Sequence, residues 1–485
     1  MTLFKFFNSD SSEKETVNLS DSLAIDRRSI FRNRVNYGVN LGSLFVLESW
    51  IYDDLFNEVG GGNSEFEAVS KCKAQFGTQA TGNKLRQHYE SYLNKIDWNF
   101  LKNVNVTSLR VPIGYWHVNN GSFLNGLPFQ PVADVYASAQ PWTYLKTLVK
   151  TAGQHDISIV IDVHGLPGGA NSEAHSGMVQ NPAVFFKTPN YVNAMCNGIL
   201  PIIVHDICLP FENIAGLQIV NEAYFDNNAN DIKAYYLRAT SNISKMDNNL
   251  PIIISDGWWP QQWSDWVSQN NISNNIIIDS HVYRCFSNED KSKDAGAIYD
   301  SLPQTVQFDK GKADFMVGEF SCVLDEETWK RTKGDRNVHI TKFGRAQTSL
   351  FPTIASFGWF FWTLQFKWGD GGEWGFVPQV SKNNLIMRSK NVKPIDSNRV
   401  AAIIAEHINY WNGKGSYFEH WRFEDAIRQA VSDIQSFNSL NNSRLGRWKS
   451  WTSRRRREYI GSKGDSQFMW EWDQGYQRGL DEFNQ

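Results

Sequence analysis

Short β-branched runs alternate with longer amphipathic stretches eight times along this chain, and this repeat limits the possible folds more than any other feature. The runs expected to form strands cover residues 37–41, 108–113, 158–163, 216–220, 251–255, 276–280, 314–318 and 358–363. Helical stretches such as residues 83–101 and 142–153 lie between them. This alternation is typical of βα units in a parallel sheet. Eight units favour an α/β fold closed as a (β/α)8 (TIM) barrel over an open sheet.

The pattern divides the chain into three parts. Residues 1–32 are polar and predict a loosely held N-terminal tail, and residues 33–415 contain the barrel, with a closing helix near residues 400–410. Residues 416–485 predict a C-terminal helical extension packed on the barrel, because apolar side chains recur at helical spacing at Phe423, Ile427, Val431 and Ile434. The basic run Arg454–Arg457 is expected to be a solvated helix face, in preference to a targeting or anionic-partner site.

Composition excludes several classes of protein. The net charge is −3 over 485 residues, which gives no electrostatic reason to bind nucleic acid or anionic membranes. No stretch approaches the ~18 apolar residues of a membrane span. The N-terminus lacks the pattern of a signal peptide, so an intracellular, by default cytoplasmic, location is expected. Five scattered cysteines predict reduced core thiols and neither disulfides nor a zinc site: Cys72, Cys196, Cys208, Cys285 and Cys322.

Polar and aromatic side chains gather where the predicted strands end, which is where barrel enzymes place their chemistry. They are Arg110, His164, Asn221, Glu222, His281, Tyr283, Glu319 and Trp362. The carboxylates Glu222 and Glu319 end strands four and seven. Glycosidic bond cleavage needs such a pair, one to protonate the leaving oxygen and one to attack the anomeric carbon or activate water. The alternative is that each carboxylate is a structural charge satisfied by Arg110 or a neighbouring histidine.

Other motifs near the strand ends favour neither a metal nor a cofactor. His164 and His281 lack the spacing of metal-ligand motifs and are expected to give polar support. The glycines after strand three lack the residues of a phosphate-binding loop and indicate a tight turn. Trp258 and Trp259 follow strand five at the same rim. At least one of them is expected to be a platform for a sugar ring.

The ordered motifs resemble the fungal exo-β-1,3-glucanases of glycoside hydrolase family 5, over residues 33–415. The motifs, in chain order, are Asn40-Leu-Gly42 with Val46-Leu-Glu48-Ser-Trp50-Ile51, Arg110-Val-Pro-Ile-Gly-Tyr-Trp, His164-Gly-Leu-Pro-Gly, Asn221-Glu222, His281-Val-Tyr283, Gly318-Glu319-Phe-Ser and Gly358-Trp-Phe-Phe-Trp362. Each fragment is weak alone, but the ordered set is specific. The resemblance implies a retaining (β/α)8 enzyme that needs no metal or cofactor.

The resemblance also implies a role for each matching residue. Glu319 is expected to be the nucleophile and Glu222 the acid/base. The catalytic support is expected from Asn221 on the sugar 2-hydroxyl, Arg110 and Tyr283 on the nucleophile, and His164 and His281 around the two acids. The substrate-binding residues are expected to be Trp362 under the glucose ring, Glu48 and Asn171 on its hydroxyls, Phe286 and Trp258 at the aglycone entrance, and Trp374.

The chain departs from the family pattern around the substrate. Ala223 replaces the proline after the acid/base glutamate, and Trp368-Gly-Asp-Gly-Gly-Glu-Trp374 replaces the acidic loop after strand eight. The secreted enzymes have no counterpart of the C-terminal extension. We therefore expect an intracellular β-glucosidase with a carbohydrate or glucoside substrate. Two alternatives stay open: hydrolysis of glucosyl lipids such as steryl glucosides or glucosylceramide, and a catalytically silent glycan-binding protein.

Overall fold

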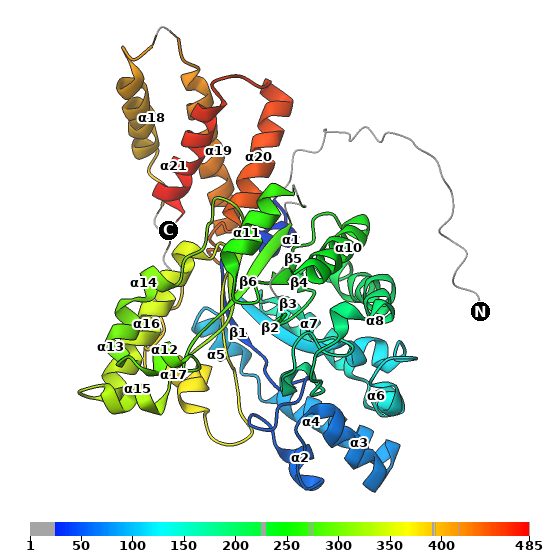
Figure 1. The fold of residues 1–485 in the computed structure, drawn as a ribbon. Helices are drawn as coiled ribbons and strands as arrows, with labels where there is room; N and C mark the ends of the chain where they lie inside the picture. Colours follow the sequence, from blue (N-terminus) through cyan, green and yellow to red (C-terminus); the bar gives the residue numbers. More distant parts are fainter. Residues whose placement is uncertain are drawn as a thin grey trace, which may run out of the picture.

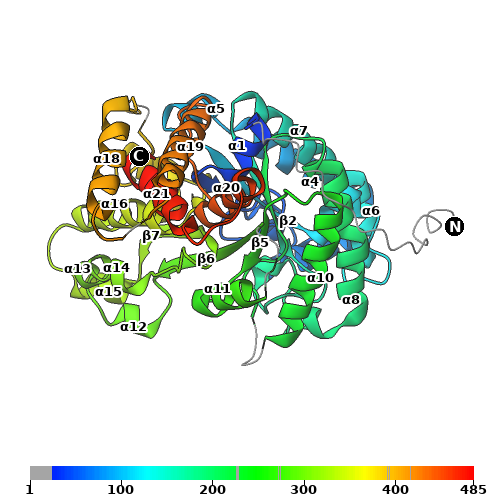
Figure 2. The same cartoon turned by 90° about the horizontal axis from the view of Figure 1, so that it is seen from above.

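The computed structural model describes residues 25–484 except 225–228, 271, 273–274, 390–391, 393 and 416. In this part of the chain, eight parallel strands close into a barrel in the order β1 to β8 (Figures 1 and 2). They are β1 (Asn36–Asn40), β2 (Ser108–Gly114), β3 (Ser158–Gly165), β4 (Ile214–Gln218), β5 (Ile252–Ser255), β6 (Ile276–Arg284), β7 (Asp314–Leu324) and β8 (Gly358–Phe361). The predicted barrel is confirmed.

Helices surround the barrel and cover its strands (Figure 2). The α-helices up to strand β8 and its following loop are α1 (Arg27–Asn33), α2 (Asp54–Glu58), α3 (Glu65–Phe76), α4 (Thr78–Asn94), α5 (Trp98–Asn103), α6 (Ala133–Ala139), α7 (Pro141–Gln154), α8 (Pro189–Ala194), α9 (Leu200–Ile203), α10 (Asn230–Met246), α11 (Pro260–Gln269), α12 (Asn288–Lys291), α13 (Ala295–Asp300), α14 (Leu302–Thr305), α15 (Glu326–Arg331), α16 (Arg336–Ile354) and α17 (Phe376–Ser381). Shorter 3-10 or π turns are η1 (Tyr115–Gly121), η2 (Gln130–Val132), η3 (Ala174–Ser176), η4 (Phe185–Lys187), η5 (Met195–Ile199), η6 (Val204–Cys208) and η7 (Gly372–Trp374).

Apolar side chains fill the barrel interior, so the barrel is a packed core and its chemistry lies at the strand ends. The interior cluster consists of Val160, Ala215, Ile253, Ile277, Met316, Phe357 and Phe360. Gly38 on β1 faces the Phe360 ring, and a Cβ at this position would lie 2.3 Å from that ring. Only glycine therefore lets β1 close against β8 here. All five cysteines are free and buried, as predicted.

The strand lengths decide which residues reach the carboxyl-terminal rim. Strands β6 and β7 run four and six residues beyond the predicted ends at 280 and 318, so His281, Tyr283 and Glu319 are themselves strand residues. Strand β4 ends earlier than predicted, at Gln218, which leaves Glu222 on the loop that follows. The predicted helix at 83–101 is two helices, because Asp97 accepts a hydrogen bond from the Phe100 amide and starts α5.

Four helices follow the barrel and stand together at one end of it (Figure 1). They are α18 (Ser397–Trp411), α19 (His420–Asn438), α20 (Trp448–Lys463) and α21 (Met469–Phe483). Glycines bring α21 close to α19, since a Cβ at Gly475 would lie 2.4 Å from the Phe423 carbonyl oxygen. The apolar side of α18, with Ile403, packs on Phe423 and Ile427 of α19. The predicted closing helix at 400–410 therefore belongs with the C-terminal helices.

These helices cover the amino-terminal end of the barrel, opposite the polar strand ends. The Lys449 amide donates a hydrogen bond to Asp314 Oδ1 at the start of β7 (3.1 Å), and Arg34 pairs with Leu445 just before β1. The predicted solvated face at Arg454–Arg457 is wrong for Arg455, which is buried with Nη2 2.6 Å from Asp433 Oδ1.

The N-terminal region is described from residue 25 onward. The last part of the predicted polar tail, from Arg27, forms α1, and its Ile30 and Phe31 are buried against the C-terminal helices. The earlier part of that predicted tail lies outside the described residues.

One helical stretch, Pro189–Cys208, is long and apolar enough to cross a membrane by length and composition alone, with a mean hydropathy of 1.2. It lies between β3 and β4 in the chain and packs on α10. Its side chains Cys196, Ile199 and Ile203 are buried in the main core. The position of this stretch in the outer layer of the barrel accounts for its apolar character.

Candidate active site

Glu319, the predicted nucleophile, is held by side chains from two other strands. Arg110 Nη1 on β2 lies 2.9 Å from Glu319 Oε1, and the Tyr283 hydroxyl on β6 donates to Glu319 Oε2 at 2.9 Å. Burial and the Glu319 charge raise the pKa of Tyr283 well above its usual value, so its phenol stays a donor. Both oxygens of Glu319 therefore accept hydrogen bonds, which fixes the orientation of its carboxylate.

Arg110 is wholly buried and forms ion pairs and hydrogen bonds with the polar side chains beneath the site. Its Nη2 lies 3.0 Å from Asp162 Oδ2 and donates to Asn221 Oδ1 at 2.7 Å. Its Nε donates to Gln218 and its Nη1 also donates to Asn40. Burial disfavours the guanidinium charge, but Asp162, Glu319 and Asp279 outweigh burial and raise the pKa of Arg110. Asp162 stands two residues before His164 in the same strand, and the sequence alone assigned it no role.

Glu222, the predicted acid/base, lies on the loop after β4 with a backbone φ of 41°. This left-handed conformation is unusual for a glutamate and needs support from its surroundings. Asn171 Nδ2 donates to the Glu222 carbonyl at 3.0 Å, and the Ala223 amide donates to Ser255 Oγ at 3.1 Å. These two bonds fix the turn that presents the Glu222 carboxylate to the site.

Two histidines flank the Glu222 carboxylate. His281 Nδ1 lies 2.7 Å from Oε1, and His175 Nε2 lies 3.1 Å from Oε2. Burial alone would raise the pKa of Glu222, but both imidazoles together lower it well below its usual value. In spite of burial, Glu222 raises the pKa of His175 to about 9, and Glu319 and Asp279 raise the pKa of His281. The resting proton therefore sits on the imidazoles, one hydrogen bond away from Glu222.

His175 is the main residue of the site that the sequence did not predict. It lies in the 3-10 turn η3, within the loop after β3, and its ring contacts His164 edge-on at 5.2 Å. His164 itself is oriented by Asp162, whose Oδ2 lies 2.7 Å from His164 Nδ1. The structure thus places the predicted His281 against both acids and the predicted His164 beside His175, which is a third imidazole in the site.

The two carboxylates lie close together. An oxygen of Glu222 and an oxygen of Glu319 are within 4.8 Å of each other, and a nitrogen of His281 lies within the same distance of both. By distance this group could hold a metal ion, but the Arg110 guanidinium already supplies the positive charge on Glu319. Retaining glycosidases place their carboxyl groups about 5–5.5 Å apart, and inverting enzymes place them about 6.5–9.5 Å apart. The nearest oxygens of Glu222 and Glu319 are therefore closer together than the carboxyl groups of inverting enzymes.

A cavity of about 760 Å³ opens above the two carboxylates. Trp362 forms part of its inner wall and stacks on His164 at 6.1 Å. Glu48 also lines this inner part, where burial raises its pKa and Trp50 Nε1 donates to it at 2.9 Å. The outer wall is aromatic and consists of Trp50, Trp258, Tyr283, Phe286 and Trp374. The predicted substrate-binding residues Glu48, Trp258, Phe286, Trp362 and Trp374 thus all line one cavity.

Asn171 has a different place from the predicted one. Besides the bond to Glu222, its Oδ1 accepts from the Glu173 amide (2.9 Å) and from Ser176 Oγ (2.7 Å). Asn171 lines a neighbouring hollow of about 470 Å³ and not the cavity above the carboxylates. Its amide is engaged within the protein, so its contribution here is to hold the Glu222 turn.

Comparison with known proteins identifies the barrel and the C-terminal helices. Residues 70–367 match the family model of the cellulases of glycosyl hydrolase family 5, which covers more than half of the chain. The chain is a family 5 glycoside hydrolase. Residues 395–485 match the model of the glucan 1,3-beta-glucosidase 3 C-terminal domain, which begins just before α18. The resemblance and the enzyme class found from the sequence are therefore confirmed.

Individual relatives of this family 5 enzyme are also glycoside hydrolases. An uncharacterized glycosyl hydrolase of Saccharomyces cerevisiae is 50% identical over 99% of this chain and 98% of its own. Glucan 1,3-beta-glucosidase 3 of Schizosaccharomyces pombe is 29% identical over 89% of this chain and 92% of its own. The rutinosidase of Aspergillus niger has a similar fold, with a TM-score of 0.57 and 20% identity over 73% of this chain and 98% of that one.

Proposed function

We propose that this family 5 enzyme is a retaining β-glycosidase that removes terminal β-D-glucosyl residues by double displacement. The separation of at most 4.8 Å between a Glu222 and a Glu319 oxygen carries the proposal. This distance is below the ~6.5–9.5 Å separation by which inverting enzymes accommodate a water between base and sugar, and it supports the retaining mechanism. The intact set of Arg110, Tyr283 and His281 around the two acids argues against a silent glycan-binding protein, because such a protein has no need to hold a charged nucleophile.

In the first step, a Glu319 oxygen attacks the anomeric carbon while the bond to the leaving oxygen breaks. Glu222 gives that oxygen a proton, which it receives from His175 or His281 through the hydrogen bonds at 3.1 and 2.7 Å. The resulting ester removes the Glu319 charge. Glu222, now ionised, then takes a proton from water as the water oxygen attacks the anomeric carbon and releases Glu319.

The inner part of the cavity supports a terminal glucose. Glu48 and Asn221 offer hydrogen-bonding groups to sugar hydroxyls, and Trp362 offers a flat apolar surface to the ring. The name of the fission yeast relative, glucan 1,3-beta-glucosidase 3, supports a β-1,3-linked or similar glucosyl substrate. We therefore propose glucose in the inner cavity and the aglycone between Trp258 and Phe286.

The stereochemistry of the first product tests the retaining mechanism. During hydrolysis of an aryl β-glucoside followed by proton NMR, β-glucose is expected to form first and α-glucose only later by mutarotation. Two displacements at one carbon restore the starting configuration, whereas one displacement inverts it. Initial release of α-glucose would contradict the proposal. The Glu222→Ala variant, which keeps the nucleophile, should give the same anomer at a lower rate.

The outer wall favours a second candidate, a glucosyl lipid substrate. Trp50, Trp258 and Phe286 line the cavity while remaining 49%, 54% and 64% exposed. Exposed aromatic side chains at a cavity mouth are costly in water unless an apolar ligand or surface covers them. A lipid aglycone leaving the cavity would contact all three side chains.

A substrate panel separates the two candidates. We would compare kcat/KM for laminaribiose and for a glucosyl lipid in mixed micelles, in the wild type and in Phe286→Ser. If lipid is the substrate, the wild type prefers the lipid, and Phe286→Ser lowers kcat/KM for the lipid about tenfold, because each lost apolar contact is worth ~1–3 kcal/mol. A preference for laminaribiose, or equal losses on both substrates, would eliminate the lipid candidate.

Loss of His175 is expected to change the pH dependence. Its pKa, raised to about 9, means that the proton beside Glu222 persists up to about that pH and is lost above it. In His175→Gln the alkaline limb of kcat/KM should therefore move to lower pH, and kcat for a poorly activated glucoside should fall about tenfold to a hundredfold. A dinitrophenyl glucoside, whose leaving group needs no proton, should be less affected.

The exposed His205 pairs with Asp206 and does not line the catalytic cavity, so His205→Gln is the matched control. It should leave both the pH profile and the leaving-group dependence unchanged. An unmoved alkaline limb in His175→Gln, with the fold intact by circular dichroism, would show that His175 does not supply the proton.

A further inference from the structure

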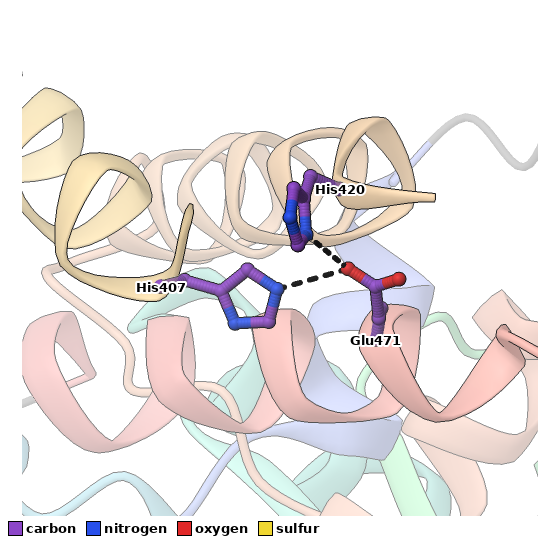
Figure 3. A group of neighbouring side chains, drawn as sticks. All are labelled: His407, His420 and Glu471. Carbon is purple, nitrogen blue, oxygen red and sulfur yellow. Dashed lines mark hydrogen bonds and ion pairs between the residues drawn. The ribbon is translucent and has the colours of Figure 1, made fainter. Parts of the chain in front are cut away.

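Two histidines and a glutamate from three different helices meet within the C-terminal helices (Figure 3). His407 lies on α18, His420 begins α19, and Glu471 lies on α21. His407 Nε2 is 2.9 Å and His420 Nδ1 is 2.7 Å from the same oxygen, Glu471 Oε2. These three atoms lie within 4.8 Å of one another. The group stands at the amino-terminal end of the barrel, far from the catalytic cavity, and takes no part in the proposed hydrolysis.

Packing and one backbone bond fix the orientation of all three side chains. The His407 ring stacks on Phe423 with centroids 3.8 Å apart, and the His420 ring stacks on Phe418 at 5.3 Å. The second oxygen of Glu471 accepts a hydrogen bond from the Glu419 amide at 2.7 Å. The Glu471 carboxylate is thus anchored through one oxygen and turns the other to two imidazoles, and carboxylates that bind metals are commonly anchored by such a hydrogen bond.

The charge at this point also favours a cation. Glu471 is completely buried, and its ion pairs among the described residues are those to His407 and His420. With neutral imidazoles the cluster carries one net negative charge in a buried place, which is costly without a positive partner. A divalent ion among the three atoms would supply that partner and bind all three groups directly.

We propose that His407, His420 and Glu471 form a binding site for a divalent transition metal, with zinc as the best fit. Two imidazole nitrogens and one carboxylate oxygen are common zinc ligands, at bond lengths of about 2.0–2.2 Å in a tetrahedron. Such bonds place the ligand atoms roughly 3.3 Å apart, so the present 2.7 and 2.9 Å separations need to open by only about half an ångström. Water fills the fourth position from the side of His420, whose side chain is 23% exposed.

The site ties together the helices that the chain connects only by loops. Two of the proposed ligands flank the segment that connects α18 and α19. His407 is near the end of α18, and His420 is the first residue of α19. Glu471 then fixes α21 to both. Zinc here acts on the stability of the C-terminal helices and not on glycoside cleavage.

Zinc titration of the full chain tests this proposal. The Glu319→Gln variant is the background for all measurements. It removes one ligand from the Glu222–His281–Glu319 group, so that metal bound at the catalytic site is not counted as metal bound at the proposed site. After chelator treatment, zinc is added in competition with a chromophoric chelator, and bound metal is counted by elemental analysis after desalting. We expect one equivalent, an increase of the melting temperature with zinc, and an X-ray absorption spectrum with two imidazoles and oxygen ligands.

Substitutions locate the bound zinc. His420→Gln, at a partly exposed position, should weaken zinc binding at least tenfold and abolish the zinc-dependent rise in melting temperature. Glu471→Gln should do the same, and His205→Gln should bind zinc like the parent. In an otherwise wild-type chain, His420→Gln should keep full glucosidase activity. Absence of a bound equivalent, or equal binding by His420→Gln and its parent, would overturn the proposal and leave a hydrogen-bonded cluster.

Discussion

Replacing Glu319 with glutamine is expected to lower kcat on aryl β-glucosides by roughly four to six orders of magnitude, the usual result of removing a nucleophile. The amide is nearly isosteric but cannot form the glycosyl ester. It also removes the charge that Arg110 and the Tyr283 hydroxyl bind at 2.9 Å each. Initial rates with a sensitive fluorogenic glucoside, together with a melting curve, measure the effect.

Glu173→Gln is the matched control for this variant. Glu173 lines the same cavity, but its hydrogen bond to Asn171 is made by its backbone amide and not by its carboxylate. The control should stay within about tenfold of the wild type, since it leaves both catalytic carboxylates in place. An activity of Glu319→Gln within tenfold of the wild type, in protein free of wild-type enzyme, would contradict the assignment of the nucleophile.

Replacing Arg110 with methionine is expected to lower the free energy of unfolding by about 3–5 kcal/mol, the cost of leaving buried charges unpaired. Arg110 lies against Asp162 at 3.0 Å and Glu319 at 2.9 Å, and both carboxylates are buried. Its loss also removes the hydrogen bonds to Asn221 and Gln218. Urea unfolding followed by tryptophan fluorescence measures the change.

A surface ion pair provides the comparison for Arg110. Arg27 bonds Asp156 and Glu212 at 2.9 Å each, but its side chain is exposed to solvent. Arg27→Met should cost less than about 1 kcal/mol, as exposed pairs do. Equal decreases in the free energy of unfolding for Arg110→Met and Arg27→Met would contradict this prediction. They would show that the buried ion pairs of Arg110 stabilise the fold no more than a surface pair does.

The barrel and most of the site could be predicted because both depend on local patterns. Alternation of β-branched and amphipathic segments determines the βα repeat, and a closed parallel barrel brings all strand ends to one rim. Arg110, Glu222, His281 and Glu319 could therefore be grouped although they span more than 200 positions of the chain. The break at Asp97 was not predicted, although aspartate is a preferred residue at a helix start.

Other features depend on contacts that no local pattern contains. His175 lies in an irregular loop, where no periodicity fixes the direction of a side chain, and only the folded loop brings it to Glu222. The amphipathic face of α18 indicates that the helix packs on something, but not that its partner is α19. Arg455 belongs to a basic run that favours a solvated face, and only the position of Asp433 on the neighbouring helix buries it.

The most direct test of the central claim is the intact mass of the enzyme after incubation with 2-deoxy-2-fluoro-β-glucosyl fluoride. This probe needs a working nucleophile and a glucose-shaped inner cavity, and it does not require the natural aglycone. We predict one fluoroglucosyl adduct per chain, located on Glu319 by peptide mapping and absent from Glu319→Gln. A folded enzyme that hydrolyses β-glucosides but forms no adduct, or forms it on another residue, would contradict the proposed mechanism.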